Sequence, residues 1–485
     1  MRTHEDVESV MAGWKRKDRD PLSVILRKSS RLYNIQTSAT LPDSLIKGDN
    51  QYLKGAFTAN DSIWDAVRPT KLSREERGIY KMIDSIKQTK TFKRIYGVGY
   101  TLTSAYIRTG KVEWGRVFEM VSWNAVEGTR LKLAARTANT FSKQLSLNGF
   151  VAYGTKDEQW KAGGGFSWNI PNKANRWQNL RGAYRYDYTM PGNINQMLTY
   201  DNILTSLTRR VPLTKLLKMQ TAELAFSRGW GRGLDNTFAV RHLTFYAGPN
   251  SGFDFSNGQQ QIDKFSVSEF QIGTHWGPGE MFFSNGANAR VTLGSKLPVF
   301  YLDYTFRYMD NFLNQNLTNH KLDLRIRHRW NWQLGYTRYT LKASKIWGLT
   351  PYPLMTVHLG NGSWLYNRFA FNMMNESEFI TDASVSLNFN HHFDGYFLNK
   401  IPLIRKLKFR EIFIFNALSG TLDPKNLAIM QLPNQATAPK FYAEIGFGIE
   451  NILQLFRVDF MWRLTQLDLP TSRPFGIKFT FAPKF

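Results

Sequence analysis

The chain ends in Phe475-Gly476-Ile477-Lys478-Phe479-Thr480-Phe481-Ala482-Pro483-Lys484-Phe485. Side chains of an extended strand point alternately to its two faces. One face of this stretch is therefore apolar and aromatic, and the other carries glycine, alanine, threonine and lysine. The chain closes on an aromatic residue. This pattern is typical of the last strand of a barrel in the outer membrane of Gram-negative bacteria, and it predicts an all-β fold.

The same alternation recurs through most of the chain, for example in 160–170, 300–308 and 456–464. Ten residues of strand tilted by about 40° give roughly 25 Å of height, the thickness of the apolar band of such barrels. We predict a transmembrane antiparallel β-barrel of about 16 strands within 101–485. The predicted strands are 126–137, 144–155, 159–169, 176–189, 218–227, 235–246, 265–276, 285–294, 297–309, 320–332, 335–347, 376–391, 406–417, 439–449, 455–465 and 475–485.

Composition supports this interpretation. The 485 residues include no cysteine, which excludes disulfide frameworks, cysteine-ligated zinc sites and thiol catalysis. The sequence has no stretch near the ~18 uninterrupted apolar residues that a spanning helix needs, and a closed barrel is the other way to cross lipid. The net charge of +25 first suggests nucleic acid. The basic residues are spread through alternating strands, however, so we predict a cationic lumen or contact with anionic lipid and no nucleic-acid partner.

Residues 1–100 have a different pattern and predict a periplasmic, partly helical lead-in. Ser73 to Glu76 resembles a capping box, and apolar residues then recur at helical spacing, which predicts a helix over 74–88. A second helix is expected around 5–30. Residues 1–20 lack the apolar core of an export signal, so we expect the sequence to begin inside a longer or processed precursor. The lead-in either packs under the barrel or docks a periplasmic or envelope protein.

The lengths of the connections predict the orientation of the barrel. If the last strand ends at the periplasm, the short connections near 155–159, 294–297, 332–335 and 449–455 are periplasmic. The long connections 348–375 and 418–438 then lie on the opposite side, as expected for such barrels.

Two long connections, 190–217 and 392–405, are also predicted to be periplasmic. They share a Pro-started apolar and basic turn that leads into a strand, at 211–218 and 401–408. We predict that their basic residues lie at the inner-leaflet interface, facing lipid phosphates. These are Lys215, Lys218, Arg405 and Lys408. The alternative is a simple helical cap on a strand end.

The inward face of the strands is rich in cations. The predicted inward set is Arg130, Lys132, Arg136, Arg181, Arg185, Arg325, Arg327, Arg329, Arg338, Lys342, Arg457 and Arg463, with the acids Asp187, Glu269, Asp303, Asp323 and Asp459. Sixteen strands are wide enough for an aqueous channel. The lumen is therefore either an anion-favouring pore or, as we favour, a network of charge pairs that holds an inserted loop.

Residues that could carry chemistry are sparse. His391 and His392 form the only histidine pair, and neighbouring strand residues face opposite sides. The chain has no Gly-x-Ser-x-Gly, His-Glu-x-x-His or phosphate-loop pattern. We predict that the protein is not an enzyme and that it uses no cofactor or metal.

Several motifs resemble a Bacteroidota outer-membrane family of unknown function whose members usually begin with a carboxypeptidase-regulatory-like domain. The matching stretches are 64–76 (Trp-Asp-x-x-Arg-Pro-x-x-Leu-Ser-x-Glu-Glu), 124–130 (Asn-x-Val-Glu-Gly-x-Arg), 153–157, 370–372 and 392–403. The resemblance implies an integral outer-membrane location, with no established activity. The family's N-terminal domain is missing from this sequence, which agrees with a truncated beginning.

The predicted topology also resembles the BamA/TamA barrels that assemble or translocate proteins. In that superfamily a long loop folds into the lumen with an Arg-Gly-aromatic tip. Here the corresponding stretch 360–369 ends in Arg368-Phe369 without the glycine. The resemblance implies a role in envelope assembly or transport, with Arg368 paired to Asp459 or Glu444.

Two other functions stay open: an anion-favouring channel, and a barrel that anchors a missing N-terminal domain. The implied partners are outer-membrane lipids and the barrel-assembly machinery. That machinery would read the C-terminal strand through Phe479, Phe481 and Phe485.

Overall fold

The computed structural model describes residues 3–11, 24–32, 73–171, 177–191, 201–248, 255–286, 289–433 and 436–482. It has two compact units, 1–56 and 57–485. In the first unit β1 (Thr3–Met11) and β2 (Val24–Leu32) form an antiparallel pair. The predicted helix around 5–30 is therefore wrong. The register places Glu8 opposite Arg27.

Two helices begin the described part of the second unit. The predicted helix over 74–88 is confirmed as α3 (Arg74–Gln88). A second helix, α4 (Lys90–Ser104), follows at once and was not predicted. It begins at Thr89, whose side-chain oxygen accepts a hydrogen bond from the amide of Phe92, and this bond satisfies one of the free N–H groups of the first turn. Within the described residues, no helix has the length and apolarity to cross a membrane.

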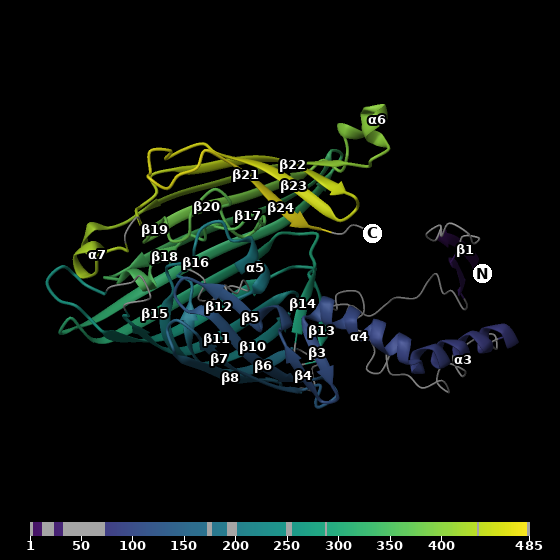
Figure 1. Cartoon of the computed structure of the whole chain (residues 1–485), viewed down its shortest axis with the longest axis horizontal. Coiled ribbons are helices and arrows are strands. Elements are labelled where there is room, and N and C mark those ends of the chain that lie inside the picture. The colour runs from purple at the N-terminus through teal and green to yellow at the C-terminus, as the bar shows by residue number, and fades with distance from the viewer. Residues whose placement is uncertain are drawn as a thin grey trace, which may run out of the picture. The chain divides into compact units, whose positions relative to one another are not determined.

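The rest of the unit is an antiparallel β-barrel, which confirms the predicted fold class (Figure 1). Its strands are β3 (Tyr106–Thr109), β4 (Val112–Gly115), β5 (Val121–Asn124), β6 (Gly128–Thr137), β7 (Leu145–Gly154), β8 (Trp160–Asn169), β9 (Gln178–Thr189), β10 (Leu217–Gly231), β11 (Leu234–Tyr246), β12 (Lys264–Trp276), β15 (Val299–Phe312), β16 (Gln315–Trp332), β17 (Gly335–Trp347), β20 (Ala383–His392), β21 (Arg410–Thr421), β22 (Tyr442–Ile452), β23 (Phe456–Arg463) and β24 (Phe475–Phe481).

Fifteen of the sixteen predicted strands are wall strands, and one is not. The stretch 285–294 belongs to a separate two-stranded sheet, β13 (Met281–Asn285) with β14 (Ala289–Gly294), inside the connection from β12 to β15. β12 pairs directly with β15, so no wall strand lies between them. The alternation in 285–294 still indicates β-structure, because the strands of a hairpin that is not part of the wall have the same two-residue period.

One wall position was missed. β4 pairs with the end of β6 and β5 pairs with its beginning, so the two short strands together fill one position beside β6. A short 3₁₀ turn, η1 (Val117–Glu119), separates them. Counted in this way, the wall runs through sixteen positions from β4/β5 to β24, with β3 as a four-residue addition beside β4. The number of strands was correct because the false strand and the missed one compensate.

This exchange moves the connections before β12 to the other end of the barrel. We name the end where β24 finishes the α6 end, after α6 (Pro402–Arg405), and the other end the α7 end, after α7 (Pro424–Ile429) (Figure 1). The antiparallel order places 190–216 and 155–159 at the α7 end, whereas 393–409 lies at the α6 end. The prediction that 190–217 and 155–159 share the end at which β24 finishes is therefore wrong.

The outer face of the wall is apolar over most of its circumference. Large apolar side chains alternate along the strands and are exposed, among them Leu131, Leu133, Trp160, Leu224, Val240, Phe270, Trp330 and Phe447. Exposure of such a band to water would be unfavourable, since the transfer of each of these side chains from water to an apolar environment is favourable by roughly 1.5–3 kcal/mol. The band therefore indicates an apolar solvent around the barrel.

Candidate functional site: an inserted loop at the edge of β24

The connection 348–382 folds back into the barrel. It contains η2 (Tyr352–Leu354), β18 (Thr356–Val357) and β19 (Ile380–Thr381), and most of its side chains are buried. Near the α7 end, Tyr352 and Leu354 pack in one apolar cluster with Phe255 and Met430, which belong to two other connections of that end. We call residues 348–382 the inserted loop.

The carboxylate of Glu444 in β22 holds the middle of the inserted loop. It accepts hydrogen bonds from the backbone amides of Asn372 and Met373, each at 2.8 Å. Asn416 and Tyr442 donate to the same carboxylate at 2.7 and 2.8 Å. Glu444 is fully buried, so these four donors replace the water that a carboxylate otherwise requires. The bonds fix the loop against the β21–β22 side of the wall.

Two arginines of β23 also hold the inserted loop. Arg463 forms a buried ion pair with Glu378 at 2.7 Å. The guanidinium of Arg457 lies 4.4 Å from the ring centroid of Tyr366, and its Nε donates to Asp459 at 2.8 Å. The predicted inward placement of Arg457, Asp459 and Arg463 is therefore confirmed.

The predicted pairing of Arg368 is wrong. Asp459 pairs with Arg457, and Glu444 is occupied by the loop amides. The guanidinium of Arg368 lies 4.5 Å from the ring centroid of Phe369, and both side chains are exposed. The buried ion pair between loop and wall has the opposite polarity to the predicted one: Glu378 of the loop pairs with Arg463 of the wall.

A segment of the inserted loop lies along the edge of β24 that faces away from β23. Leu365 and Phe479 form a parallel β-bridge. The amide of Tyr366 donates to the carbonyl of Phe479 at 2.8 Å, and the amide of Phe479 donates to the carbonyl of Trp364 at 2.9 Å. From the neighbouring position, the buried ammonium of Lys478 donates to the carbonyls of Asn361 and Ser363 at 3.2 and 2.6 Å.

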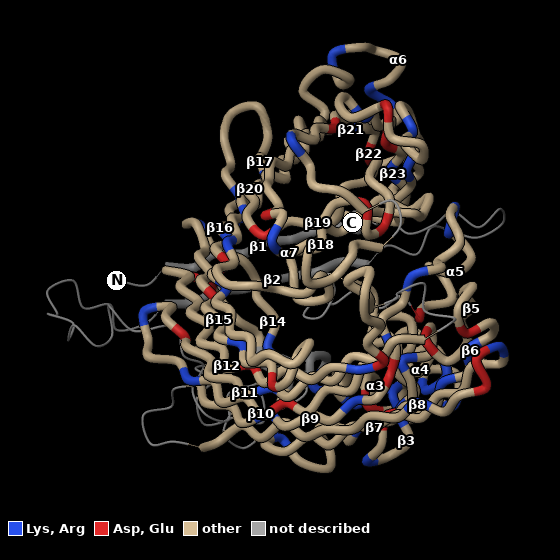
Figure 2. Tube along the Cα trace, turned by 90° about the vertical axis from the view of Figure 1, so that its left-hand side faces the viewer, with Lys and Arg blue, Asp and Glu red and all other residues tan. Residues whose placement is uncertain are grey.

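A second connection, 190–216, joins this segment to the start of the barrel wall. It contains α5 (Ile203–Thr208), which lies between β5 and the β23–β24 side (Figures 1 and 2). The amide of Trp364 donates to the carbonyl of Thr208 at 2.9 Å, and Arg209 pairs with Glu376 at 2.5 Å. On the other side, the hydroxyl of Ser206 accepts from the amide of Trp123 in β5 at 3.1 Å.

We call this arrangement the seam. The strand order closes with β24 next to β3. In the described part of the chain, however, no residue-by-residue ladder joins β24 to β3 or β5. The contacts that we find across this interval run from β24 through 364–366 and 206–211 to β5. Two loops thus fill the place of a continuous ladder.

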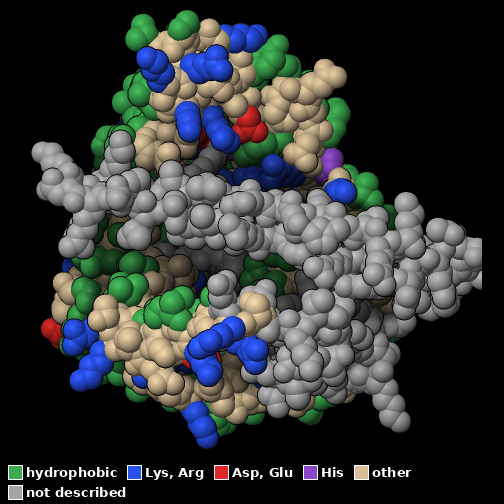
Figure 3. Space-filling model, turned by 90° about the vertical axis from the view of Figure 1, so that its right-hand side faces the viewer, with side chains coloured by type: hydrophobic (Ala, Val, Ile, Leu, Met, Phe, Trp, Pro, Cys, Tyr) green, Lys and Arg blue, Asp and Glu red, His purple; other side chains and the backbone are tan. Residues whose placement is uncertain are grey.

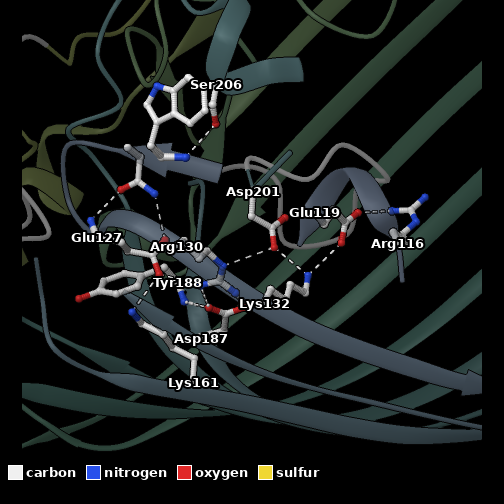
Figure 4. A network of polar contacts seen from close by, with 12 residues as sticks. Arg116, Glu119, Glu127, Arg130, Lys132, Lys161, Asp187, Tyr188, Asp201 and Ser206 are labelled. Carbon is white, nitrogen blue, oxygen red and sulfur yellow. Dashed lines mark hydrogen bonds and ion pairs between the residues drawn. The ribbon is translucent and has the colours of Figure 1, made fainter. Parts of the chain in front are cut away.

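A buried charge network fixes the second connection to the wall (Figure 4). Arg130 in β6 makes two hydrogen bonds to Asp187 at 2.8 and 3.0 Å and one to Glu127 at 2.6 Å. Asp201 of the second connection lies 3.6 Å from Arg130 and 2.7 Å from Lys132. The network confirms that Arg130 and Lys132 face inward, and it makes Asp201 the anchor of this connection.

The four basic residues predicted at one lipid interface do not lie together. Lys215 and Lys218 are at the α7 end, and Arg405 and Lys408 are exposed at the α6 end. Lys218 donates to Gln159 and faces the ring of Tyr186 at 5.1 Å. The single-interface prediction is therefore wrong for Lys215 and Lys218, because the false strand at 285–294 had reversed the side predicted for their connection.

Of the predicted insertion signal, Phe479 and Phe481 are described. Both lie on the outer face of β24 and are exposed. Phe485 falls outside the described residues. Their recognition by assembly machinery stays a prediction.

Several residues of the site were not predicted in these roles: Lys478, Glu378, Asp201 and Ser206. Lys478 was visible as the cationic position of an otherwise apolar strand. Its partners are backbone carbonyls of a loop more than a hundred residues away, and no local pattern indicates such a contact.

Several solved protein structures are similar to this architecture. The chain is similar in structure to BamA from Haemophilus ducreyi lacking POTRA domains 1–3, with 9% identity and a TM-score of 0.44 over 98% of this chain and 89% of that one. CdiB from Acinetobacter baumannii has 11% sequence identity and a TM-score of 0.39, and the match covers 74% of this chain and 57% of that one. The outer membrane protein OprD from Pseudomonas aeruginosa has 10% sequence identity and a TM-score of 0.27, and the match covers 78% of this chain and 91% of that one. At these levels no function is carried over.

No curated protein matches the sequence. Residues 93–425, more than half of the chain, match the C-terminal domain of the family of unknown function DUF5686. This confirms the resemblance to a family of unknown function, while the Bacteroidota source and the carboxypeptidase-regulatory-like domain stay predictions. The chain thus belongs to the DUF5686 family.

Proposed function

We propose that this protein is an integral outer-membrane barrel that acts in envelope assembly or transport by opening the seam at β24. The observation that carries this proposal is the parallel bridge between Leu365 and Phe479. A strand edge that pairs with a short loop segment becomes an unpaired edge when the loop moves, and an unpaired edge accepts a strand from another chain.

The location is part of the proposal. Wall strands of 10 residues or more, such as β6, β10 and β16, suit an apolar layer of about 25 Å, and the exposed apolar band suits contact with acyl chains. In this orientation the α6 end, with 393–409, faces the periplasm together with α3 and α4. The protein is proposed to act without catalysis or cofactor, with outer-membrane lipids and an envelope protein as partners.

The energetics favour a seam that opens before the rest of the wall. Neighbouring wall strands such as β15 and β16 are joined by long continuous ladders. Within the described residues, the contacts of the β24 edge with the loop include the two backbone bonds at Phe479 and the two bonds of Lys478. Each hydrogen bond contributes about 0.5–1.5 kcal/mol net, and somewhat more when one partner is charged, so the seam opens at a much smaller cost than a ladder.

The test uses the absence of cysteine from the chain. The double variant Leu365→Cys/Phe479→Cys places two thiols at bridge partners, and oxidation locks the seam. The matched control, Val385→Cys/Ser419→Cys, locks two strands that are already joined by a ladder. The probe is a synthetic peptide of residues 475–482, offered to the protein in lipid vesicles and captured by photocrosslinking.

We expect the peptide to be captured by the reduced seam variant and by both forms of the control, and to be lost when the seam variant is oxidised. Equal capture by the locked and unlocked seam variants would overturn the proposal. A steady anion-selective conductance from the locked barrel in a planar bilayer would favour the alternative, an anion channel.

A further inference from the structure

Strands β16 and β17 carry cations in an arrangement that disfavours folding. Their register places Arg329 opposite Arg338 and Arg325 opposite Lys342. Like charges directly opposite each other in a sheet are destabilising. These positions alternate with the apolar Leu324 and Ile326 of the outer face, so the cations face the interior of the barrel.

Elsewhere in the barrel, several inward cations have carboxylate partners. Arg130, Lys161, Arg241, Arg307, Arg457 and Arg463 each form at least one ion pair. Within the described residues we find no ion pair for Arg325, Arg327, Arg329, Arg338, Lys342 or Arg368. We call these six residues the arginine ladder. Cations without an ion pair are thus concentrated on the β16–β17 side of the barrel.

Aromatic rings support the ladder. The guanidinium of Arg325 lies 4.1 Å from the ring centroid of Tyr301, and that of Arg327 lies 4.9 Å from it. Tyr336 supports Arg329 and Arg338 at 4.0 and 5.0 Å. A guanidinium that rests its face on a ring keeps its N–H edges for an acceptor in its plane. Two of these edges have a neutral partner: Arg327 donates to the hydroxyl of Tyr301, and Arg329 donates to the side-chain oxygen of Asn331 at 3.2 Å.

The nearby carboxylates do not neutralise the ladder. Asp303 and Asp323 lie opposite each other at its upper end, toward the α7 end. Asp323 pairs with Lys321 at 3.3 Å, and Asp303 accepts a hydrogen bond from Gln271 at 3.2 Å. Within the described residues, neither Asp303 nor Asp323 forms an ion pair with a residue of the ladder.

The inserted loop contributes the last cation. Partial burial and the charges of Arg338 and Arg327 lower the pKa of Arg368 below its usual value. Arg368 is therefore within electrostatic range of Arg338 and Arg327. Figure 3, which views the barrel from the α6 end, shows Lys and Arg side chains gathered within the opening.

We propose that the arginine ladder binds a phosphate-bearing anion of several negative charges inside the barrel. Arginine matches phosphate with two parallel hydrogen bonds, and its N–H edges here lack a protein carboxylate. From Arg325 to Arg329 the strand advances about 13 Å, so the ladder suits a ligand with more than one phosphate group. This inference does not rest on the opening of the seam.

The ligand can come from a membrane or from solution. The experiment therefore uses two probes, inorganic tripolyphosphate and detergent micelles that contain phosphatidic acid. Binding to the purified full chain is measured by calorimetry, and the apparent melting temperature is measured with and without each probe. The variant is Arg325→Gln/Arg327→Gln/Arg329→Gln. The control, Lys143→Gln/Arg232→Gln/Lys425→Gln, removes three exposed cations elsewhere.

We expect the variant to lose binding by about tenfold for each arginine, while the control binds as the parent does. Without probe the variant melts at the same or a higher temperature than the parent, because like-charge repulsion is relieved. A response to micelles alone assigns a lipid headgroup, and a response to tripolyphosphate alone assigns a soluble ligand. Both support the site.

Three results would overturn the proposal: neither probe binds the parent, the control loses as much affinity as the variant, or the variant melts at a lower temperature without probe. The last result would mean that the cations of the ladder stabilise the fold and are not kept for a ligand. If the triple variant does not fold, Arg338→Gln/Lys342→Gln removes the opposite half of the ladder and is tested in the same way.

Discussion

Phe479 and Leu365 pair as neighbouring strands do, although one belongs to the last strand of the barrel and the other to a loop that begins at β17. The loop thereby covers an edge that a barrel otherwise closes with its first strand. On its other side the same loop segment contacts 208–211. The state of the seam therefore depends on the contacts that hold the inserted loop in place.

Replacing Glu444 by glutamine should release the middle of the inserted loop. The carboxylate accepts four hydrogen bonds, and an amide turns one donor group toward these donors. We expect a loss of about 2 kcal/mol in the free energy of loop docking. Hydrogen exchange of the amides of Asn372 and Met373 should accelerate more than tenfold, while Glu158→Gln, at an exposed position, leaves it unchanged. Unchanged protection in Glu444→Gln would show that packing alone holds the loop.

Replacing Arg130 by methionine should destabilise the whole barrel. The variant leaves Asp187, Glu127 and Asp201 buried without their shared cation. Removal of one partner from a buried charge network costs about 3–5 kcal/mol. The measurement is the temperature at which the barrel unfolds in detergent, read from its gel mobility. Arg181→Met, whose side chain is half exposed, should have a much smaller effect.

The period of the sequence predicts strands well and predicts their place in the sheet poorly. The two-residue alternation identified fifteen wall strands, because one apolar face and one polar face are required at every wall position. The errors at their ends reach seven residues, where the predicted strand 376–391 corresponds to β20 (Ala383–His392). The same alternation is satisfied by 285–294 in a hairpin outside the wall. The β4/β5 position was missed because its two strands have four residues each, too few to show a period.

Only part of the candidate site was predicted, because a local pattern shows which way a side chain faces and does not show which residue it contacts. Inward positions such as Arg457 and Asp459 follow from strand parity. Their partners do not, since contacts such as Glu444 with Asn372 join residues that are 72 apart in the chain. The error over Arg368 has the same origin: which cation is buried beside a carboxylate depends on how the loop folds.

Acid should loosen the inserted loop through His358. Burial, followed by the charges of Lys342 and Lys321, lowers the pKa of His358 to about 3. In an unfolded loop the pKa is about 6.5. Neutral His358 therefore stabilises the docked loop fully above about pH 6.5, and this contribution is lost as the pH falls toward 3. Protease cleavage of the loop should rise between pH 6.5 and 4, and His358→Gln should flatten this rise. An equal rise in His358→Gln and in the exposed control His242→Gln would exclude His358 as the cause.

Lys478 should control the seam more directly than any other residue of β24. Lys478→Met keeps the length of the side chain and removes the ammonium, so the buried carbonyls of Asn361 and Ser363 lose their donor. One charge-assisted hydrogen bond is worth about 1.5–3 kcal/mol, which predicts that a thiol at Leu365→Cys reacts with a water-soluble maleimide about tenfold faster or more. The control is Thr480→Val on the same strand, because the buried Thr480 hydroxyl has no hydrogen-bond partner and its loss should leave the rate unchanged. Faster labelling in both variants would point to general loosening of β24, whereas faster labelling in Lys478→Met alone locates the latch of the seam at its ammonium group.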